Sequence, residues 1–225
     1  MINLSKRFLG LKTSSPKRQE ALLRLCLTEL NRKVDYSINH DTGVNIIESQ
    51  VFGILYPLSF FLKADTYSFN QEKRFYASFQ GFIDLAGGRL KMLKPFMNRN
   101  DCLIINDNYG RNVLNKFKFN DEYFKNMSMS RYVLCPHHVN WKGDIHKLWT
   151  YRFLEAIIAK SIPVVFRETP LSIEFTNGFD FFYDDQIPTD LSDEDYNEIV
   201  NKNYRHLLLN NSTITLMKHN ASKSQ

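Results

Sequence analysis

Residues 130–166 constrain the fold of this chain more strongly than any other stretch. Two short apolar runs, residues 132–135 and 162–166, are typical of buried strands, and the second is rich in β-branched residues. Between them, apolar residues recur at helical spacing after Thr150, a residue type that favours the N-cap position. Strand, helix and strand in this order predict a βαβ unit with two parallel strands in one sheet.

The same alternation continues on both sides of this unit. Strands are predicted at residues 75–79, 102–105 and 179–183, and helices at residues 89–97, 121–129 and 192–211. Strands that alternate with helices indicate an α/β fold. We therefore expect a Rossmann-like parallel sheet with helices on both faces.

The first 72 residues have a different pattern. Ser15 and Pro16 mark the start of a helix to about residue 31, and polar residues 34–44 predict a loop. Apolar residues between 46 and 54 predict a second helix that breaks near Pro57. The predicted organisation is thus a reduced, mainly helical N-terminal region (1–72), a Rossmann-like nucleotide-binding domain (73–217) and a loose tail (218–225).

Composition narrows the class of protein. The net charge is +5, which indicates an anionic partner, but 29 basic residues are mixed with 24 acidic ones. The three cysteines lie in apolar runs without metal-ligand spacing, as expected of free thiols in a reducing compartment. The N-terminus lacks a secretory signal, and the apolar run 51–62 is too short to span a membrane. We expect a cytoplasmic protein in which this run is a core helix or, alternatively, makes a peripheral membrane contact.

Polar side chains gather where the first strand of the βαβ unit ends and its helix begins. In open α/β sheets this is the edge at which ligands bind. The residues concerned are His137, His138, Lys142, Asp144, His146, Lys147, Tyr151, Arg152 and Glu155.

Five segments of the chain, taken in order, resemble the C-terminal, nucleotide-sugar-binding half of exostosin-like glycosyltransferases. The segments are KRFYASFQG, GGRLKML, DCLIIND, YFKNMSMSRYVLCP and YRFLEAIIAKSIPVVF. They are also similar to the donor half of fucosyltransferases, which has a basic residue at the place of Arg152. The resemblance covers roughly residues 73–184. Two departures are Lys160, where the family usually has a small residue, and His137 and His138, where it has Gly or Arg-Gly.

The resemblance implies a donor domain of the GT-B type. It also implies transfer of a sugar from a UDP- or GDP-linked donor to a glycan, polysaccharide or lipopolysaccharide, with inversion at the sugar carbon expected. In this reading the helix N-terminus at Thr150 seats the diphosphate, and Arg152 adds donors for its oxygens. His146 or Lys147 adds a second charge, while Glu155 accepts the ribose hydroxyl protons.

Other residues complete this predicted donor site. Arg89 is a phosphate candidate at a strand-to-helix turn, and Gly81 ends the preceding strand. His137 is a candidate donor contact, and Tyr151 could stack on the base or simply pack. Arg152 and Glu155 could instead form a surface ion pair of little energetic consequence.

The sequence leaves the general base open. The candidates are Asp84, His138, Asp41 and Glu48. Asp193 and Asp195 have the Asp-x-Asp spacing of a metal-binding motif, but acidic residues are expected at a helix start, so we predict no metal and no cofactor.

The expected partners are the nucleotide-sugar donor and a glycan or lipid-linked glycan acceptor, without nucleic acid. The oligomeric state stays open. An alternative from another class is a non-catalytic nucleotide- or nucleic-acid-binding Rossmann module, which the basic pI of about 9.0 motivates. A dinucleotide oxidoreductase ranks low, because no strand is followed by G-x-G-x-x-G.

Overall fold

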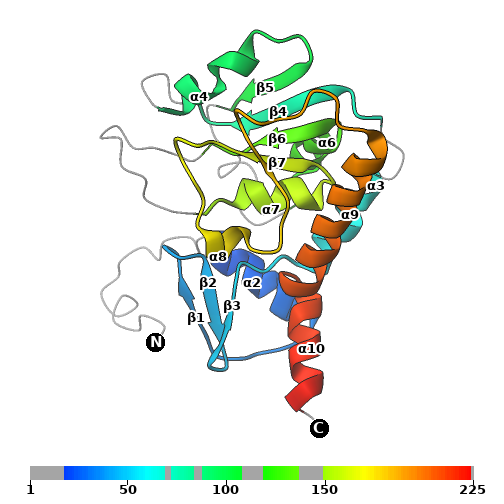
Figure 1. Ribbon diagram of the computed structural model, residues 1–225. Helices are drawn as coiled ribbons and strands as arrows, with labels where there is room; N and C mark the ends of the chain where they lie inside the picture. The colour runs from blue at the N-terminus through cyan, green and yellow to red at the C-terminus, as the bar shows by residue number, and fades with distance from the viewer. Residues whose placement is uncertain (1–17, 69–71, 84–87, 108–118, 137–148, 224–225) are drawn as a thin grey trace.

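A five-stranded sheet lies at the centre of the molecule. The computed structural model describes residues 18–68, 72–83, 88–107, 119–136 and 149–223. The sheet has the order β5-β4-β6-β7-β8, and every neighbouring pair is parallel (Figure 1). Its strands are β4 (Phe75–Gly81), β5 (Cys102–Asn106), β6 (Ser130–Leu134), β7 (Ile162–Val165) and β8 (Phe182–Tyr183). The predicted α/β fold with a Rossmann-like parallel sheet is confirmed.

Helices cover both faces of this sheet. Tyr132 and Leu134 of β6 point into a core shared with α4, whereas Val133 between them points into the core beneath α6 and α7. The long helix α9 contributes to both cores. The helices are α2 (Arg18–Glu29), α3 (Leu58–Ser68), α4 (Gly88–Met97), α6 (Asp121–Ser128), α7 (Tyr151–Ile158), α8 (Ile173–Thr176), α9 (Asp193–Asn210) and α10 (Thr213–Lys223).

The N-terminal region contains more helix than strand, as predicted, and α2 matches the helix predicted to about residue 31, but the predictions for residues 34–54 are wrong. Instead of a loop at 34–44 and a helix through 46–54, the chain forms an antiparallel sheet of β1 (Tyr36–Asn39), β2 (Val44–Ile47) and β3 (Gln50–Phe52). Asn45 and Ile47 are buried while Ile46 is exposed, a period of two that fits a strand and not a helix. Glu48 and Ser49, with φ of 47° and 66°, make the tight turn between β2 and β3.

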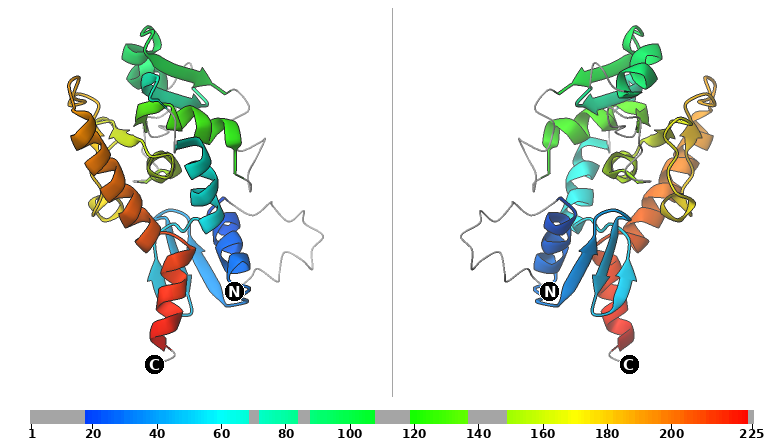
Figure 2. Two further views of the ribbon diagram at one scale, coloured as in Figure 1. Left: turned by 90° about the vertical axis from the view of Figure 1, so that its right-hand side faces the viewer. Right: turned by 90° about the vertical axis from the view of Figure 1, so that its left-hand side faces the viewer.

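The prediction of a loose tail from residue 218 is also wrong in the described part of the chain. Helix α10 continues to Lys223, and its residue Leu216 is buried in a small core with Leu23 and Cys26 of α2. Figure 2 shows α2 and α10 beside the small antiparallel sheet. Both ends of the described chain therefore build this second, smaller unit.

A carboxylate near the end of α2 joins three helices. Glu29 accepts the backbone N–H groups of Leu58 and Ser59 at 2.7 and 2.9 Å, which caps the start of α3. It also accepts the hydroxyl of Thr213 at the start of α10. The hydrogen bonds lower the pKa of Glu29 against the opposing effect of its burial.

None of the helices in the described ranges has the length and apolar character needed to cross a membrane.

Candidate functional site

Arg152 lies at the carboxyl edge of the parallel sheet. It follows the first residue of α7, yet its side chain reaches β4, where Nη2 donates to the carbonyl of Gln80 at 2.9 Å. Its guanidinium carbon lies 4.3 Å from the centroid of the Phe79 ring. Arg152 is only 5% exposed, and its Nε–H has no hydrogen-bond partner. No carboxylate pairs with it among residues that the structure describes, so it is a buried cation with donor capacity to spare.

Arg89 brings a second guanidinium to the same ring. Its carbon lies 5.7 Å from the Phe79 centroid. Nη1 donates to the Phe82 carbonyl at 2.8 Å, and Nη2 lies 3.5 Å from the carbonyl of Pro136, just beyond the end of β6. Two cations from α4 and α7 thus converge where β4 and β6 end. Two positive charges that contact one ring favour the binding of an anion nearby.

Gly81 allows the close approach of Arg152 to the strand. A Cβ atom at this position would lie 2.6 Å from Nη2 of Arg152, which is too short for any real contact. The structure brings together three residues that the sequence predicts to share one site: Arg152, Arg89 and Gly81. We refer to Phe79, Gly81, Arg89 and Arg152 as the arginine site.

The start of α7 lies against the antiparallel sheet. Thr150 is the N-cap, as predicted, but its side chain accepts no hydrogen bond from the first turn. The Tyr151 ring packs edge-on against Trp149, with centroids 4.8 Å apart. Trp149 donates from its indole nitrogen to the carbonyl of Asp41 at 2.9 Å. Asp41, one of the general-base candidates, is therefore close to the beginning of α7, whereas Glu48 pairs with Arg32 at 2.9 Å.

The structure does not support a ribose contact from Glu155. This residue is fully buried, and its carboxylate accepts hydrogen bonds from Tyr56 at 3.3 Å and Tyr123 at 3.0 Å. It also forms an ion pair with Arg18 at the start of α2. Arg152 and Glu155 do not pair with each other. One helical turn separates a cation at the sheet edge from a carboxylate in the interior, because α7 enters the core between α3 and α6.

The chain matches no known family model and none of the curated proteins with which it was compared.

Several predicted site residues lie outside the described ranges. They are Asp84, His137, His138, His146 and Lys147. The roles suggested for them, as general base or as donor contacts, stay predictions.

The Asp-x-Asp pattern lies at the opposite edge of the sheet. Asp193 pairs with Arg131 at 2.8 Å, and Asp195 belongs to the cap of α9, where its backbone N–H and its carboxylate both contact the Ser192 hydroxyl. Within the part of the chain covered by the structure, no group of three His, Cys, Asp or Glu side chains could hold a metal ion.

Sequence reasoning missed two parts of the arginine site. Phe79 supplies the ring on which both guanidinium groups lie, and the carbonyl of Pro136 orients Arg89. The signal for Phe79 was present, since it precedes Gly81 by two residues on a strand that ends at the ligand-binding edge. Nothing in the sequence pointed to Arg18 as a partner of Glu155, because 137 residues separate them.

Proposed function

We propose that this chain is a glycosyltransferase that takes a sugar from a nucleotide-diphosphate donor, UDP- or GDP-linked, and transfers it to a glycan, polysaccharide or lipopolysaccharide. The observation that carries the proposal is the arginine site. Arg152 is buried without a carboxylate partner in the described chain, and Arg89 shares its aromatic platform at the carboxyl edge of β4 and β6. The ordered segments that resemble exostosin-like enzymes support the same reading.

The chemistry of transfer needs positive charge at this place. As the acceptor hydroxyl oxygen attacks the anomeric carbon, the bond from that carbon to the diphosphate oxygen breaks, and the diphosphate leaves with the bonding electrons. Guanidinium groups stabilise this developing charge through paired, charge-assisted hydrogen bonds. The Nε–H of Arg152 is buried without a hydrogen-bond partner and lies beside the donors that Arg152 would offer to the diphosphate.

The acceptor hydroxyl must also lose its proton. A carboxylate or imidazole near the edge would take it, and Asp84, His138 and Asp41 remain the candidates. Asp41 is the one that the structure describes close to α7, through the contact of its carbonyl with Trp149. The ribose contact once expected of Glu155 must come from a different group, since that carboxylate is occupied in the interior.

A thermal-shift screen against UDP, GDP, CMP and their sugars tests the proposal. A ligand present at about one hundred times its Kd stabilises the folded state by about 2.7 kcal/mol, which raises Tm by about 5–10 °C in a protein of this size. The expected result is such a shift for one nucleotide class, followed by release of free nucleotide when an acceptor glycan is added.

Two variants and one control locate the binding. Arg152→Gln and Arg89→Gln are each expected to remove the shift, whereas Arg99→Gln, at an exposed arginine paired with Asp101, is expected to keep it. A wild-type protein that no nucleotide stabilises would refute the proposal. Binding without transfer to any glycan, together with steeply salt-dependent oligonucleotide binding, would identify the chain as a non-catalytic binding module instead.

A further inference from the structure

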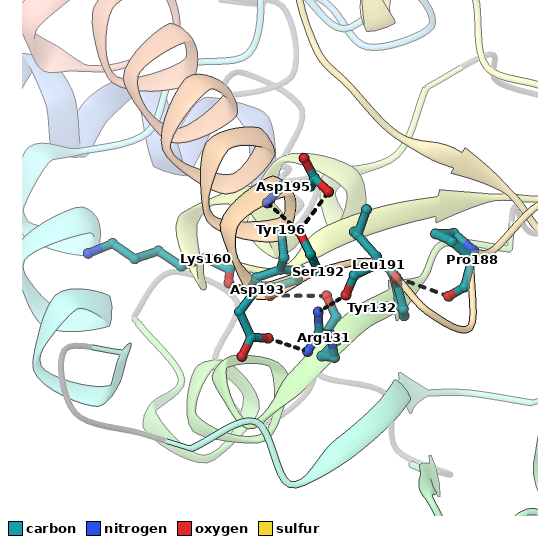
Figure 3. A network of polar contacts seen from close by, with 9 residues as sticks. All are labelled: Arg131, Tyr132, Lys160, Pro188, Leu191, Ser192, Asp193, Asp195 and Tyr196. Carbon is teal, nitrogen blue, oxygen red and sulfur yellow. Dashed lines mark hydrogen bonds and ion pairs between the residues drawn. The ribbon is translucent and has the colours of Figure 1, made fainter.

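A second group of cations gathers at the amino edge of the sheet, away from the arginine site. Lys73 precedes β4, Arg131 is the second residue of β6 and Lys160 precedes β7, and these strands are neighbours in the order β4-β6-β7. The three residues line a pocket of about 490 Å³, whose other wall is the beginning of α9. Figure 3 shows Arg131 and Asp193 beside Tyr196, with the Lys160 side chain extending away from them.

Lys73 is the central cation of this pocket. Its ammonium donates to the carbonyls of Ser128 at 2.8 Å and Lys160 at 2.7 Å, and to the Ser161 hydroxyl at 3.3 Å. These are neutral acceptors at the ends of α6 and α7. No carboxylate pairs with Lys73 within the described ranges. Burial, then the charges of Arg131 and Lys160, lower its pKa to about 7.

One aromatic ring gathers two of the cations. The Tyr196 ring lies 5.8 Å from Nζ of Lys73 and 4.7 Å from the guanidinium carbon of Arg131. The Tyr196 hydroxyl donates to the carbonyls of Arg131 and Lys160 at 3.2 and 3.1 Å, which fixes the ring in place. The platform is therefore rigid before any ligand arrives.

The acidic residues near the pocket described by the structure do not form an ion pair with Lys73. Asp193 holds Arg131 at 2.8 Å, but its side chain is 88% exposed, and Asp65 of α3 holds Lys160 at 2.9 Å from outside the lining. Glu72 lines the mouth. The pair of Arg131 with the exposed Asp193 side chain contributes little and can exchange its partner readily.

Neutral donors complete the lining. Asn197 and Asn201 stand one turn apart on the exposed side of α9, and the hydroxyl oxygen of Ser68 is buried without a hydrogen-bond partner. We propose that this pocket, built by Lys73, Arg131, Lys160 and the first turns of α9, binds a small oxyanion of the sulfate, phosphate or carboxylate class. The proposal is independent of the arginine site and of the proposed transfer reaction.

Anion binding and protonation of Lys73 are coupled at such a site. An anion binds the charged form of the lysine more tightly than the neutral form, so its binding raises the pKa of Lys73. A tenfold preference corresponds to a rise of about one pH unit. Sulfate is the suitable probe, because its own charge is constant over this pH range. Malonate, a carboxylate dianion, tests whether the pocket binds carboxylates as well as sulfate.

The experiment follows the Lys73 side chain by NMR. Its ε-carbon and ε-proton shifts, correlated to the backbone amide, are titrated in sodium chloride and in sodium sulfate of equal ionic strength. We expect the midpoint to rise by about one unit in sulfate, and sulfate to bind about tenfold more tightly at pH 6 than at pH 8.5. Equal midpoints in the two salts would overturn the proposal.

Two matched substitutions tie the effect to the pocket. Asn201→Asp places a negative charge on the exposed wall of α9 and is expected to weaken sulfate binding about fivefold, by the repulsion of one unit charge close to the anion. Asn98→Asp, at an exposed position after α4, makes the same charge change away from the pocket and is expected to leave binding unchanged. Equal effects of the two variants would also overturn the proposal.

Discussion

Substitution of Lys73 should change how stability depends on pH. The pKa of Lys73 is about 7 in the folded protein and 10.5 in its ordinary state, because burial and two neighbouring cations oppose its charge. Below pH 7 Lys73 carries its proton in both the folded and the unfolded chain. The folded state then bears the full free-energy cost of holding the charged ammonium in a buried site. As pH rises from 7 toward 10.5, the folded state loses its proton first and the protein becomes more stable. At 1.36 kcal/mol per pH unit, the gain from pH 7 to 9 is about 2 kcal/mol.

Lys73→Met removes this titration. The difference in the free energy of unfolding between wild type and variant is expected to move by about 2 kcal/mol in favour of the wild type from pH 7 to 9. The difference is the quantity to measure, since other groups titrate in both proteins. Burial raises the pKa of Cys26 to about 12 and of Cys102 to about 11, which lowers stability at higher pH in both. Urea unfolding followed by circular dichroism, in chloride without sulfate or phosphate, gives both free energies.

Controls separate this effect from the general loss of a charge. Lys91→Met, at a side chain that is 76% exposed, gives the pH trend produced by the loss of a surface lysine. The arginine of Lys73→Arg keeps its charge over the whole pH range. The free energy of unfolding of the wild type should therefore rise with pH relative to that of Lys73→Arg, as it does relative to Lys73→Met. A difference between wild type and Lys73→Met that stays constant from pH 7 to 9 would refute the reasoning.

Three further predictions use the same urea measurement. Glu155→Gln should lower stability by about 3 kcal/mol, because it breaks a buried ion pair with Arg18; lost nucleotide binding at unchanged stability would contradict this structural role. Lys160 has a φ of 54°, so Lys160→Gly should relieve strain and stay within about 0.5 kcal/mol of wild type, whereas Lys160→Ala loses the ion pair with Asp65 and should cost about 1 kcal/mol. Ser49→Gly should stabilise by about 0.5 kcal/mol, because the turn holds this residue at a φ of 66°, and lower stability would argue against that turn.

The parallel sheet could be predicted because its strands are short apolar runs set between helices with clear periodicity. The structure also explains one departure from the exostosin-like pattern. Lys160 occupies a left-handed position just after α7, where glycine is the residue that fits without strain. The departure is therefore compatible with the same turn, at an energetic cost that the contacts of Lys160 with Asp65 and Tyr204 offset.

The antiparallel sheet was missed because its apolar residues fit two periods. Ile46, Ile47 and Val51 suit a helix as well as two short strands, and the choice depended on the turns. The turn residues Asp41 to Gly43 between β1 and β2 are a hairpin signal, but the polar stretch around them is equally typical of a loop. The turn at Glu48 gave no such signal, since neither of its central residues is glycine or asparagine.

The candidate site could also be predicted only in part. Arg89 and Arg152 could be placed together because both follow the ends of neighbouring parallel strands, and such ends meet at one edge. The buried position of Glu155 could not be predicted, because its partners come from α2, from Tyr56 and from α6, far away along the chain. A side chain's position on a helix gives its direction, but the identity of what lies there is a property of the assembled fold.

The small core shared by α2 and α10 has a consequence for synthesis. Leu216 emerges from the ribosome almost two hundred residues after Leu23 and Cys26. The parallel sheet is complete once β8 has been made, but the antiparallel unit must wait for nearly the whole described chain. During this interval Leu23 and Cys26 can already pack against Ile47 and Leu55, which belong to the same small core and follow α2 closely in the chain, but the contact with Leu216 forms only after the last helix has been made.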